Sequence, residues 1–299
     1  MSGRRVGSAV PPCAFLVRGA TTIIVVDSQV HIWAENTPDR PWVLGPERAH
    51  RAVPYTKDEV LGLMEEAGVD RAILVPPSLE GDRNDLCLEA ARAHPDRFAV
   101  MGRLYLDRPE ARARLLEMKQ QQGMLGARLT FHRDNDRPLL TNGAADWFWP
   151  EAQRWGIPVM VHAPERLPQI ADIARRHPDL TLIVDHMGFA RETMDGNAPA
   201  GADRILKLAQ FPNVSVKVSA APAYSSEPYP FRNLHESLKR IIDGFGVRRC
   251  YWGSDLTRLP KQCSYRQVVT LFTEELGFLS KNDLEWIMGR ALLERLNWK

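Results

Sequence analysis

The sequence has few cysteines and no long apolar run. Its 299 residues include 4 cysteines, none of them in a Cys-x-x-Cys pair or near a histidine at zinc-finger spacing. A chain of this length with so few cysteines is not expected to be held together by disulfide bonds. We therefore expect the protein to lie in the reducing environment of the cytoplasm. No stretch approaches the roughly 20 apolar residues of a membrane-spanning helix, so no membrane is expected as a partner.

Charge of one sign is not in excess either. The chain has 39 Lys and Arg residues against 37 Asp and Glu residues, a net charge of +2. This balance lacks the basic excess typical of nucleic-acid-binding proteins, so nucleic acid is not expected as a partner. The first turn, Ser28-Gln-Val-His31, has no Gly-x-Gly-x-x-Gly motif, and no Walker motif occurs. Both absences argue against a nucleotide-binding fold.

Short apolar runs alternate with helix-like stretches from residue 23 onward. The expected strands are 23–27, 71–75, 98–103, 125–131, 157–162, 180–186, 214–218 and 250–255. The expected helices between them are 57–67, 85–94, 109–122, 145–155, 167–177, 202–210 and 233–245. Eight such units predict an α/β fold with a parallel sheet closed into a single (β/α)8 TIM barrel. We expect residues 1–21 to form a loose N-terminal tail and residues 22–299 to form the barrel.

Polar side chains follow most of the expected strands. In a barrel of this kind, chemistry takes place at the C-terminal ends of the strands. The candidates, in chain order, are Asp27, Gln29, His31, Arg103, Arg128, His162, Asp185, His186, Lys217 and Asp255. Taken singly, each has a structural interpretation: Asp255 as a helix cap, for example, or Lys217 in a buried salt bridge. Their convergence on one end of the barrel indicates a functional site.

Several of these segments resemble the amidohydrolase superfamily. They are Asp27-Ser-Gln29-Val-His31, the strand ending in His162, Asp185-His186-Met-Gly188 and Trp252-Gly-Ser-Asp255. Within that superfamily they are most similar to the branch that holds 2-pyrone-4,6-dicarboxylate lactonase and sugar lactonases. The resemblance runs from about residue 23 to the C-terminus, and it implies a TIM barrel with a hydrolytic or closely related reaction.

The chain departs from that family at two positions that concern metal binding. Gln29 replaces the first histidine of the family's His-x-His motif, and an amide oxygen is a poor zinc ligand. Arg128, a fixed cation, is the residue that strand four offers where a two-metal site needs a bridging ligand. A single zinc or manganese ion held by His31, His162 and Asp255 stays open, but no obligatory metal is expected.

These residues suggest the hydrolysis of a small lactone that carries a carboxylate. Asp255 is the expected general base, with His31, His162 and His186 as partners that stabilise the oxyanion. Gln29, Arg103, Arg128 and Lys217 are the expected contacts of an anionic substrate, although the cations could instead pair with Asp27, Asp185 or loop acids. The alternatives are a lactone isomerase, a metal-dependent decarboxylase or a non-catalytic small-molecule-binding barrel. A homo-oligomer also stays open.

Aromatic residues are frequent in the loops expected at this end of the barrel. They are Trp33, Trp42, Tyr55, Tyr105, Tyr224 and Tyr229. They either line a pocket for a ring-shaped substrate or pack within the loops.

Overall fold

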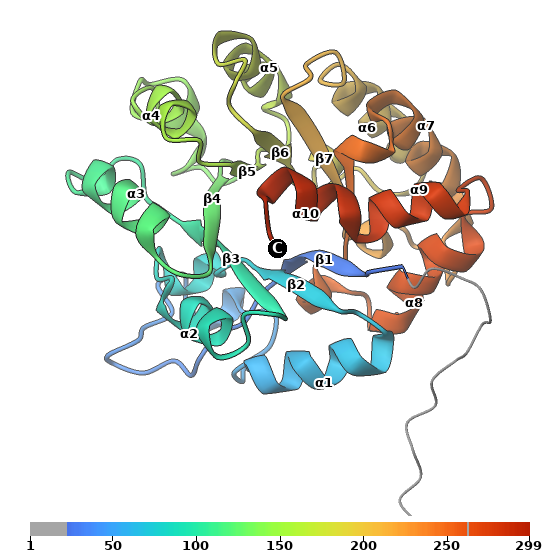
Figure 1. Cartoon of the computed structure of the whole chain (residues 1–299), viewed down its shortest axis with the longest axis horizontal. Helices are drawn as coiled ribbons and strands as arrows, with labels where there is room; N and C mark the ends of the chain where they lie inside the picture. Colours follow the sequence, from blue (N-terminus) through green and yellow to red (C-terminus); the bar gives the residue numbers. More distant parts are fainter. Residues whose placement is uncertain (1–22, 262) are drawn as a thin grey trace, which may run out of the picture.

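The computed structural model describes residues 23–261 and 263–299, and its strands form one eight-stranded parallel sheet in the order β1 to β8 (Figure 1). The strands are β1 (Val26–Val30), β2 (Arg71–Leu74), β3 (Phe98–Arg103), β4 (Met124–Thr130), β5 (Val159–His162), β6 (Leu182–Val184), β7 (Val214–Ser219) and β8 (Cys250–Gly253). This order confirms the predicted single (β/α)8 barrel. The expected tail, residues 1–21, lies outside the described residues.

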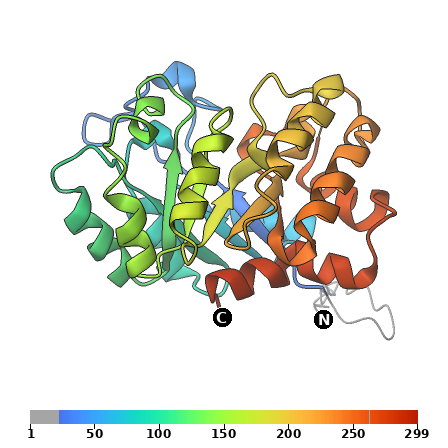
Figure 2. The ribbon, with the colours of Figure 1, turned by 90° about the horizontal axis from the view of Figure 1, so that it is seen from above.

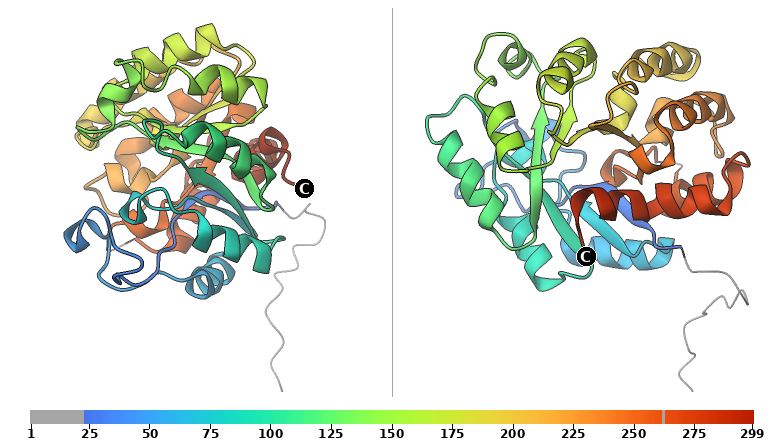
Figure 3. Two further views of the ribbon diagram at one scale, coloured as in Figure 1. Left: turned by 90° about the vertical axis from the view of Figure 1, so that its left-hand side faces the viewer. Right: turned by 45° about the horizontal axis from the view of Figure 1, so that its top comes forward.

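Helices surround the sheet on the outside (Figure 3). They are α1 (Lys57–Ala67), α2 (Asp85–Ala93), α3 (Ala111–Gln120), α4 (Phe148–Arg154), α5 (Leu167–Arg176), α6 (Ala198–Leu206), α7 (His235–Phe245), α8 (Tyr265–Thr270), α9 (Lys281–Glu285) and α10 (Ala291–Leu296). Helix α1 has the bounds that its sequence predicts. The Thr56 side chain accepts a hydrogen bond from the Glu59 N–H at its start, and Gly68 ends it in the left-handed region.

Strand β1 is the largest departure among the expected strands, and helix α6 begins and ends four residues before its expected bounds. The sequence predicts residues 23–27, whereas the strand spans Val26–Val30. The prediction ended at the first acidic residue, but Asp27 and Gln29 continue the strand as fully buried side chains. Both have polar partners inside the protein, which removes the cost of burying them. As a result, Gln29 lies within the strand and His31 follows its last residue.

The N-terminal end of the barrel is closed by the C-terminal helices. In Figure 2 the last helix lies at one end of the barrel and the segment after β1 lies at the other. The π-helical segment Trp286–Arg290 joins α9 to α10 and packs against β8 and β1. Apolar residues of the π-helical segment and of α10 share a buried cluster with strand residues such as Ile73 and Met160. In the part of the chain that the structure describes, no helix is long and apolar enough to cross a membrane.

Asp27 joins the first strand to the last. Its Oδ1 accepts hydrogen bonds from the backbone N–H groups of Gln29 and Ser254, each at 2.9 Å. Its Oδ2 accepts from the hydroxyls of Ser254 at 2.5 Å and Tyr265 at 2.7 Å. The Asp255 N–H also donates to the Gln29 carbonyl at 3.0 Å. Together these bonds tie the residues that follow β8 to β1.

We predict that Tyr265→Phe lowers the free energy of unfolding by about 1.5–3 kcal/mol, because it removes a hydrogen bond to a buried carboxylate. Tyr229→Phe is the matched control, since its hydroxyl bonds only the neutral Thr270 hydroxyl, at 2.9 Å. It should cost only about 0.5–1.5 kcal/mol. Urea unfolding of both variants makes the comparison, and equal losses would contradict a special role for the Asp27 junction.

Candidate active site

A cavity of about 990 Å³ lies at the C-terminal end of the strands. Residues from the strand ends and from the long segment between β1 and α1 line it, and that segment includes a short 3-10 helix, Pro46–Arg48. The lining side chains that can ionise are His31, His50, His132, His162, His186, Asp255, Glu47, Asp134, Glu165, Glu192, Arg48, Arg103, Arg128, Arg133, Arg137, Arg191 and Arg258. The structure therefore brings together six of the eight site residues that the sequence predicts.

Asp255 lies two residues after the end of β8, on the cavity wall. Its backbone is in the left-handed region, with a φ of 51° that an aspartate tolerates better than most residues. Its side chain is 1% exposed, and neither carboxylate oxygen has a hydrogen-bond partner among the described residues. The carboxylate faces His31 Nε2 at 3.3 Å and His186 Nε2 at 3.6 Å. Asp255 precedes a 3-10 turn but its side chain does not cap it, which argues against the helix-cap interpretation.

The Asp255 carboxylate is ionised at neutral pH. Burial raises its pKa, but the neighbouring His186, His31 and Arg258 lower it by more, so the pKa lies below its ordinary value. A buried ionised carboxylate without a hydrogen-bond donor is costly for the fold. Such groups are typical of functional sites rather than of structural ones.

His186 and His162 are neutral at pH 7. Burial lowers the pKa of His186 to about 4 against the opposing charges of Asp255 and Asp185. Burial also lowers the pKa of His162 well below its ordinary value, and the neighbouring His186 adds to that effect. The His186 backbone is left-handed, with a φ of 53°, and its Nδ1 lies 2.8 Å from the Ser219 hydroxyl. These rings can therefore give or take single hydrogen bonds without carrying a charge.

Lys217 and Gln29 lie behind the cavity wall. Both side chains are fully buried, and neither is among the residues that line the cavity. The Lys217 ammonium donates to Gln29 Oε1 at 2.7 Å and pairs with Asp185 Oδ1 at 2.9 Å. Arg128 Nε pairs with the other oxygen of Asp185 at 3.0 Å. For Lys217, then, the interpretation as a buried ion pair agrees with the structure, and a direct contact with substrate does not.

Arg103 and Arg128 converge on one hydroxyl. Thr130 Oγ1 accepts from Arg103 Nη2 at 3.0 Å and from Arg128 Nη1 at 2.5 Å. Burial lowers the pKa of Arg103, and the charges of Arg128 and Arg133 lower it further. Among the residues described, Arg103 has no salt bridge to a carboxylate. Of these two buried guanidinium groups only Arg128 pairs with a carboxylate among the described residues, that of Asp185, and this favours an anion in the cavity.

Among the cavity-wall residues that sequence reasoning missed are His50, His132, Arg133 and Arg258. His132 and Arg133 directly follow β4 and were within reach of the strand-end argument. Arg258 lies three residues after Asp255, with its Nε 3.8 Å from the carboxylate. His50 belongs to the long segment after β1, where no periodic pattern signals a position. Of the six loop aromatics, Trp33 and Tyr224 line the cavity.

The residues present do not fit a single metal ion held by His31, His162 and Asp255. The Gln29 amide oxygen is already bound to the Lys217 ammonium, and the Gln29 amide nitrogen lies 3.2 Å from His31 Nε2. That contact uses the ring nitrogen which faces Asp255. No group of three potential metal-binding side chains is assembled within residues 23–261 and 263–299.

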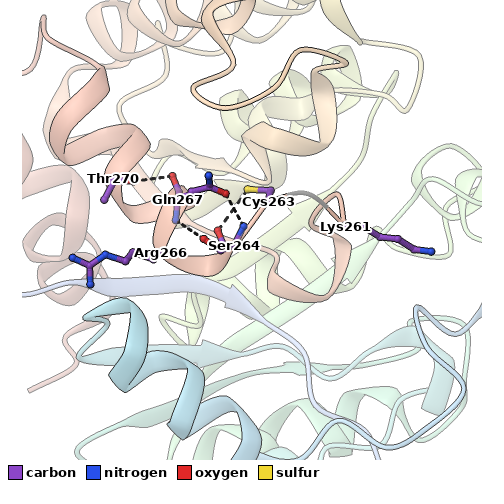
Figure 4. A pocket seen from close by; sticks show the side chains of 6 residues that line it. All are labelled: Lys261, Cys263, Ser264, Arg266, Gln267 and Thr270. Atoms are coloured by element: carbon purple, nitrogen blue, oxygen red, sulfur yellow. Dashed lines mark hydrogen bonds between the residues drawn. The ribbon is translucent and has the colours of Figure 1, made fainter.

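A second, more open hollow lies at the start of α8 (Figure 4). It is lined by Lys261, Cys263, Ser264, Arg266, Gln267 and Thr270, none of which lines the large cavity. Its hydrogen bonds are those of the Ser264–Gln267 capping box that begins the helix, with two more from Cys263 Sγ and Thr270 Oγ1 to backbone carbonyls of the same segment. We therefore assign no chemistry to it.

Comparison with known proteins gives consistent matches along the chain. The amidohydrolase family model matches residues 26–291. The L-fucono-1,5-lactonase of Burkholderia ambifaria is 23% identical over 242 residues, which cover 77% of this chain and 79% of the relative. The 4-sulfomuconolactone hydrolase of Hydrogenophaga intermedia is 22% identical over 77% of this chain and 73% of its own length. A crystal structure of an amidohydrolase from Burkholderia multivorans with bound zinc superposes with a TM-score of 0.77 at 22% identity, covering 92% of this chain and 99% of that one.

We predict that the protein loses stability as the pH falls from about 6.5 toward 4. Burial lowers the pKa of His186 and His50 to about 4 and of His132 to about 3, from 6.5 in the unfolded chain. In that window the unfolded chain binds more protons than the folded one, so the free energy of unfolding rises with pH. Denaturant unfolding between pH 7 and pH 4.5 measures the slope.

His132→Gln should flatten that slope. His235→Gln is the matched control, because His235, the first residue of α7, contacts the Pro230 carbonyl oxygen away from the cavity wall. This variant should change the slope less than His132→Gln does. An unfolding free energy that is independent of pH across this window would contradict the neutral state of the cavity histidines.

Proposed function

The chain belongs to the amidohydrolase family, and on that premise we propose that it hydrolyses a small, carboxylate-bearing lactone with water activated by Asp255. The observation that carries the proposal is the Asp255 carboxylate, which is buried, ionised and without a hydrogen-bond donor among the described residues of the cavity. Both named relatives, the L-fucono-1,5-lactonase and the 4-sulfomuconolactone hydrolase, have names that denote the opening of a lactone.

In the proposed reaction, Asp255 accepts a proton from a water molecule as the water oxygen bonds to the lactone carbonyl carbon. The bond from that carbon to the ring oxygen then breaks, and the proton passes to the ring oxygen as it leaves. One water is consumed and one hydroxy acid is formed.

The negative charge that develops on the carbonyl oxygen needs a hydrogen-bond donor in the cavity. His162 and His186 line the wall and are uncharged at neutral pH, since burial lowers the pKa of each. A neutral imidazole carries one N–H, and a donor fixed by packing stabilises the transition state without having to reorganise. We assign this task to His162, which packs edge-on against His186 and His132.

The anionic group of the substrate is assigned to Arg103 and Arg128, with Arg133 beside them. The guanidinium groups of Arg103 and Arg128 share the Thr130 hydroxyl, so their orientation is fixed before substrate binds. Arg133 bonds the Ser78 hydroxyl on the same wall. A carboxylate accepts paired hydrogen bonds from such a fork, and the substrate's charge offsets the cost of burying two cations.

We further propose that no metal is obligatory for this reaction. The zinc-bound relative shows that a barrel of this fold can hold a metal. In this chain, the contact of the Gln29 amide with His31 and the three cations near Asp255 and Asp185 (Lys217, Arg128 and Arg258) support hydrolysis by protein groups alone. Asp255 then has the task that a metal-bound hydroxide would otherwise perform.

A panel of lactones with and without a carboxylate tests the proposed function, and Asp255→Asn tests the mechanism. We predict that this variant lowers kcat by about 100- to 10,000-fold, the usual loss for a positioned general base. KM should change only within roughly threefold, because the arginine contacts remain. No turnover of any lactone by the unmodified protein would reject the function. Near-normal kcat in the variant would move the base to another residue.

Arg103→Met is predicted to raise KM for a carboxylate-bearing lactone by roughly 10- to 100-fold, the value of a lost charge-assisted hydrogen bond. KM for the methyl ester of the same substrate should change much less. Arg137→Met is the matched control, because Arg137 lines the same cavity but is partly exposed and pairs with Asp134 and Glu165. If both variants raise KM equally, the anionic group binds elsewhere in the cavity.

A further inference from the structure

Lys217 is a fully buried ammonium group that the proposed reaction does not use. It lies on β7 with no exposed side-chain surface. Burial lowers its pKa, while the charge of Asp185 and the hydrogen bond to it raise it. Burying a lysine costs several kcal/mol of solvation even when it is paired, and Arg128 already pairs with the same aspartate. The second partner of Lys217, Gln29, points to what the cation does.

The contact with Lys217 fixes which way the Gln29 amide points. A lysine ammonium can only donate hydrogen bonds, so the atom 2.7 Å from Lys217 Nζ must be the amide oxygen. The amide NH2 group then faces His31, with Gln29 Nε2 3.2 Å from His31 Nε2. An NH2 group can only donate, so it requires the lone pair of His31 Nε2.

The other nitrogen of His31 gives the complementary constraint. His31 Nδ1 lies 2.6 Å from the Val75 carbonyl oxygen, which only accepts hydrogen bonds, so Nδ1 carries the ring proton. With Nδ1 a donor and Nε2 an acceptor, the ring is uncharged and has one defined tautomer. The single lone pair of Nε2 is already engaged by the Gln29 amide.

We propose that Lys217 is a positioning residue that acts through Gln29 to hold His31 as a neutral hydrogen-bond acceptor beside Asp255. This arrangement has two consequences. His31 cannot donate a proton to Asp255, so the carboxylate remains free to accept one from water. The lone pair that a divalent cation would need is engaged, and an ammonium lies directly behind the amide. Lys217 and Gln29 together therefore exclude a metal from this corner of the site.

Nitrogen-15 NMR of the histidine rings tests the first consequence in the unmodified protein. We expect His31 to show a protonated Nδ1 and an unprotonated Nε2 at pH 7. In Gln29→Met the donor to Nε2 is lost, and in Lys217→Met the Gln29 amide is free to turn. In both variants Nε2 should take up a proton from solvent, because the ionised Asp255 carboxylate then stabilises an N–H at that position. Arg128→Met is the matched control, since it removes another cation from Asp185 but leaves the Lys217–Gln29–His31 contacts intact. A protonated Nε2 in the unmodified protein would overturn the proposal.

Zinc content after dialysis against a zinc buffer tests the second consequence. The unmodified protein should retain no zinc. Gln29→His supplies an imidazole in place of the amide and should bind about one zinc per chain. Gln210→His, an added histidine at an exposed position, is the control and should bind none. Stoichiometric zinc in the unmodified protein, or equal zinc in the unmodified protein and Gln29→His, would overturn the proposal.

These outcomes do not depend on which lactone, if any, the protein hydrolyses, since neither measurement uses turnover. If a substrate is found, Lys217→Met should also lower kcat by about 10- to 100-fold, the usual effect of removing a residue that orients a catalytic side chain. KM should change little, because Lys217 does not line the cavity. A change in KM alone would contradict a role exerted through His31.

Discussion

The carboxylate of Asp27 holds the barrel and its candidate active site in register. Four donors from β1, β8 and α8 converge on its two oxygens. Burial raises the pKa of this carboxylate against those hydrogen bonds, so the junction is made at an energetic cost. In return, the hydrogen bonds of Asp27 fix the backbone next to two residues of the candidate site, Gln29 and Asp255. Gln29 follows Asp27 by two residues, and Asp255 directly follows Ser254, so both are set by one anchor.

The charges in the interior are arranged unevenly around the cavity. Asp185 serves two cations, Lys217 behind the wall and Arg128 on it. Burial and those two cations have opposing effects on the pKa of Asp185, and the net result lies below the ordinary value. Arg103 takes no share of that carboxylate and depends on a carbonyl and a hydroxyl instead. The wall thus carries a guanidinium group without a carboxylate partner among the described residues, Arg103, as well as the Asp255 carboxylate, and such fixed charges form a polarised environment for an ester carbonyl.

Periodicity was sufficient to predict the barrel, and strand ends were sufficient to predict most of the cavity wall. Helix α1 and strand β3 have their predicted bounds because capping residues and apolar runs mark them locally. Strand β1 was displaced because the partners of Asp27 and Gln29 are about 190 or more residues away in sequence, on β7, β8 and α8. The expectation that Lys217 contacts substrate has the same origin. The position of a residue along a strand indicates how near it lies to the C-terminal end of the barrel, but it does not indicate which distant side chain it pairs with. The place of His50 on the cavity wall could not be predicted, because it lies in a long loop whose path is not determined by any local sequence pattern.

The closure of the N-terminal end by the C-terminal helices separates the residues that stabilise this end of the barrel from those that line the cavity. One apolar cluster joins Trp286, Leu292 and Trp298 to the inner residues of the barrel floor. The residues that determine chemistry lie at the opposite end, on loops that this cluster does not include. Substitutions of cavity-lining residues that change substrate specificity should therefore leave the packing of the N-terminal cluster intact, and with it most of its contribution to the free energy of unfolding. For directed evolution, the segment from residue 34 to residue 54 is the natural place to randomise, with the C-terminal helices kept as they are.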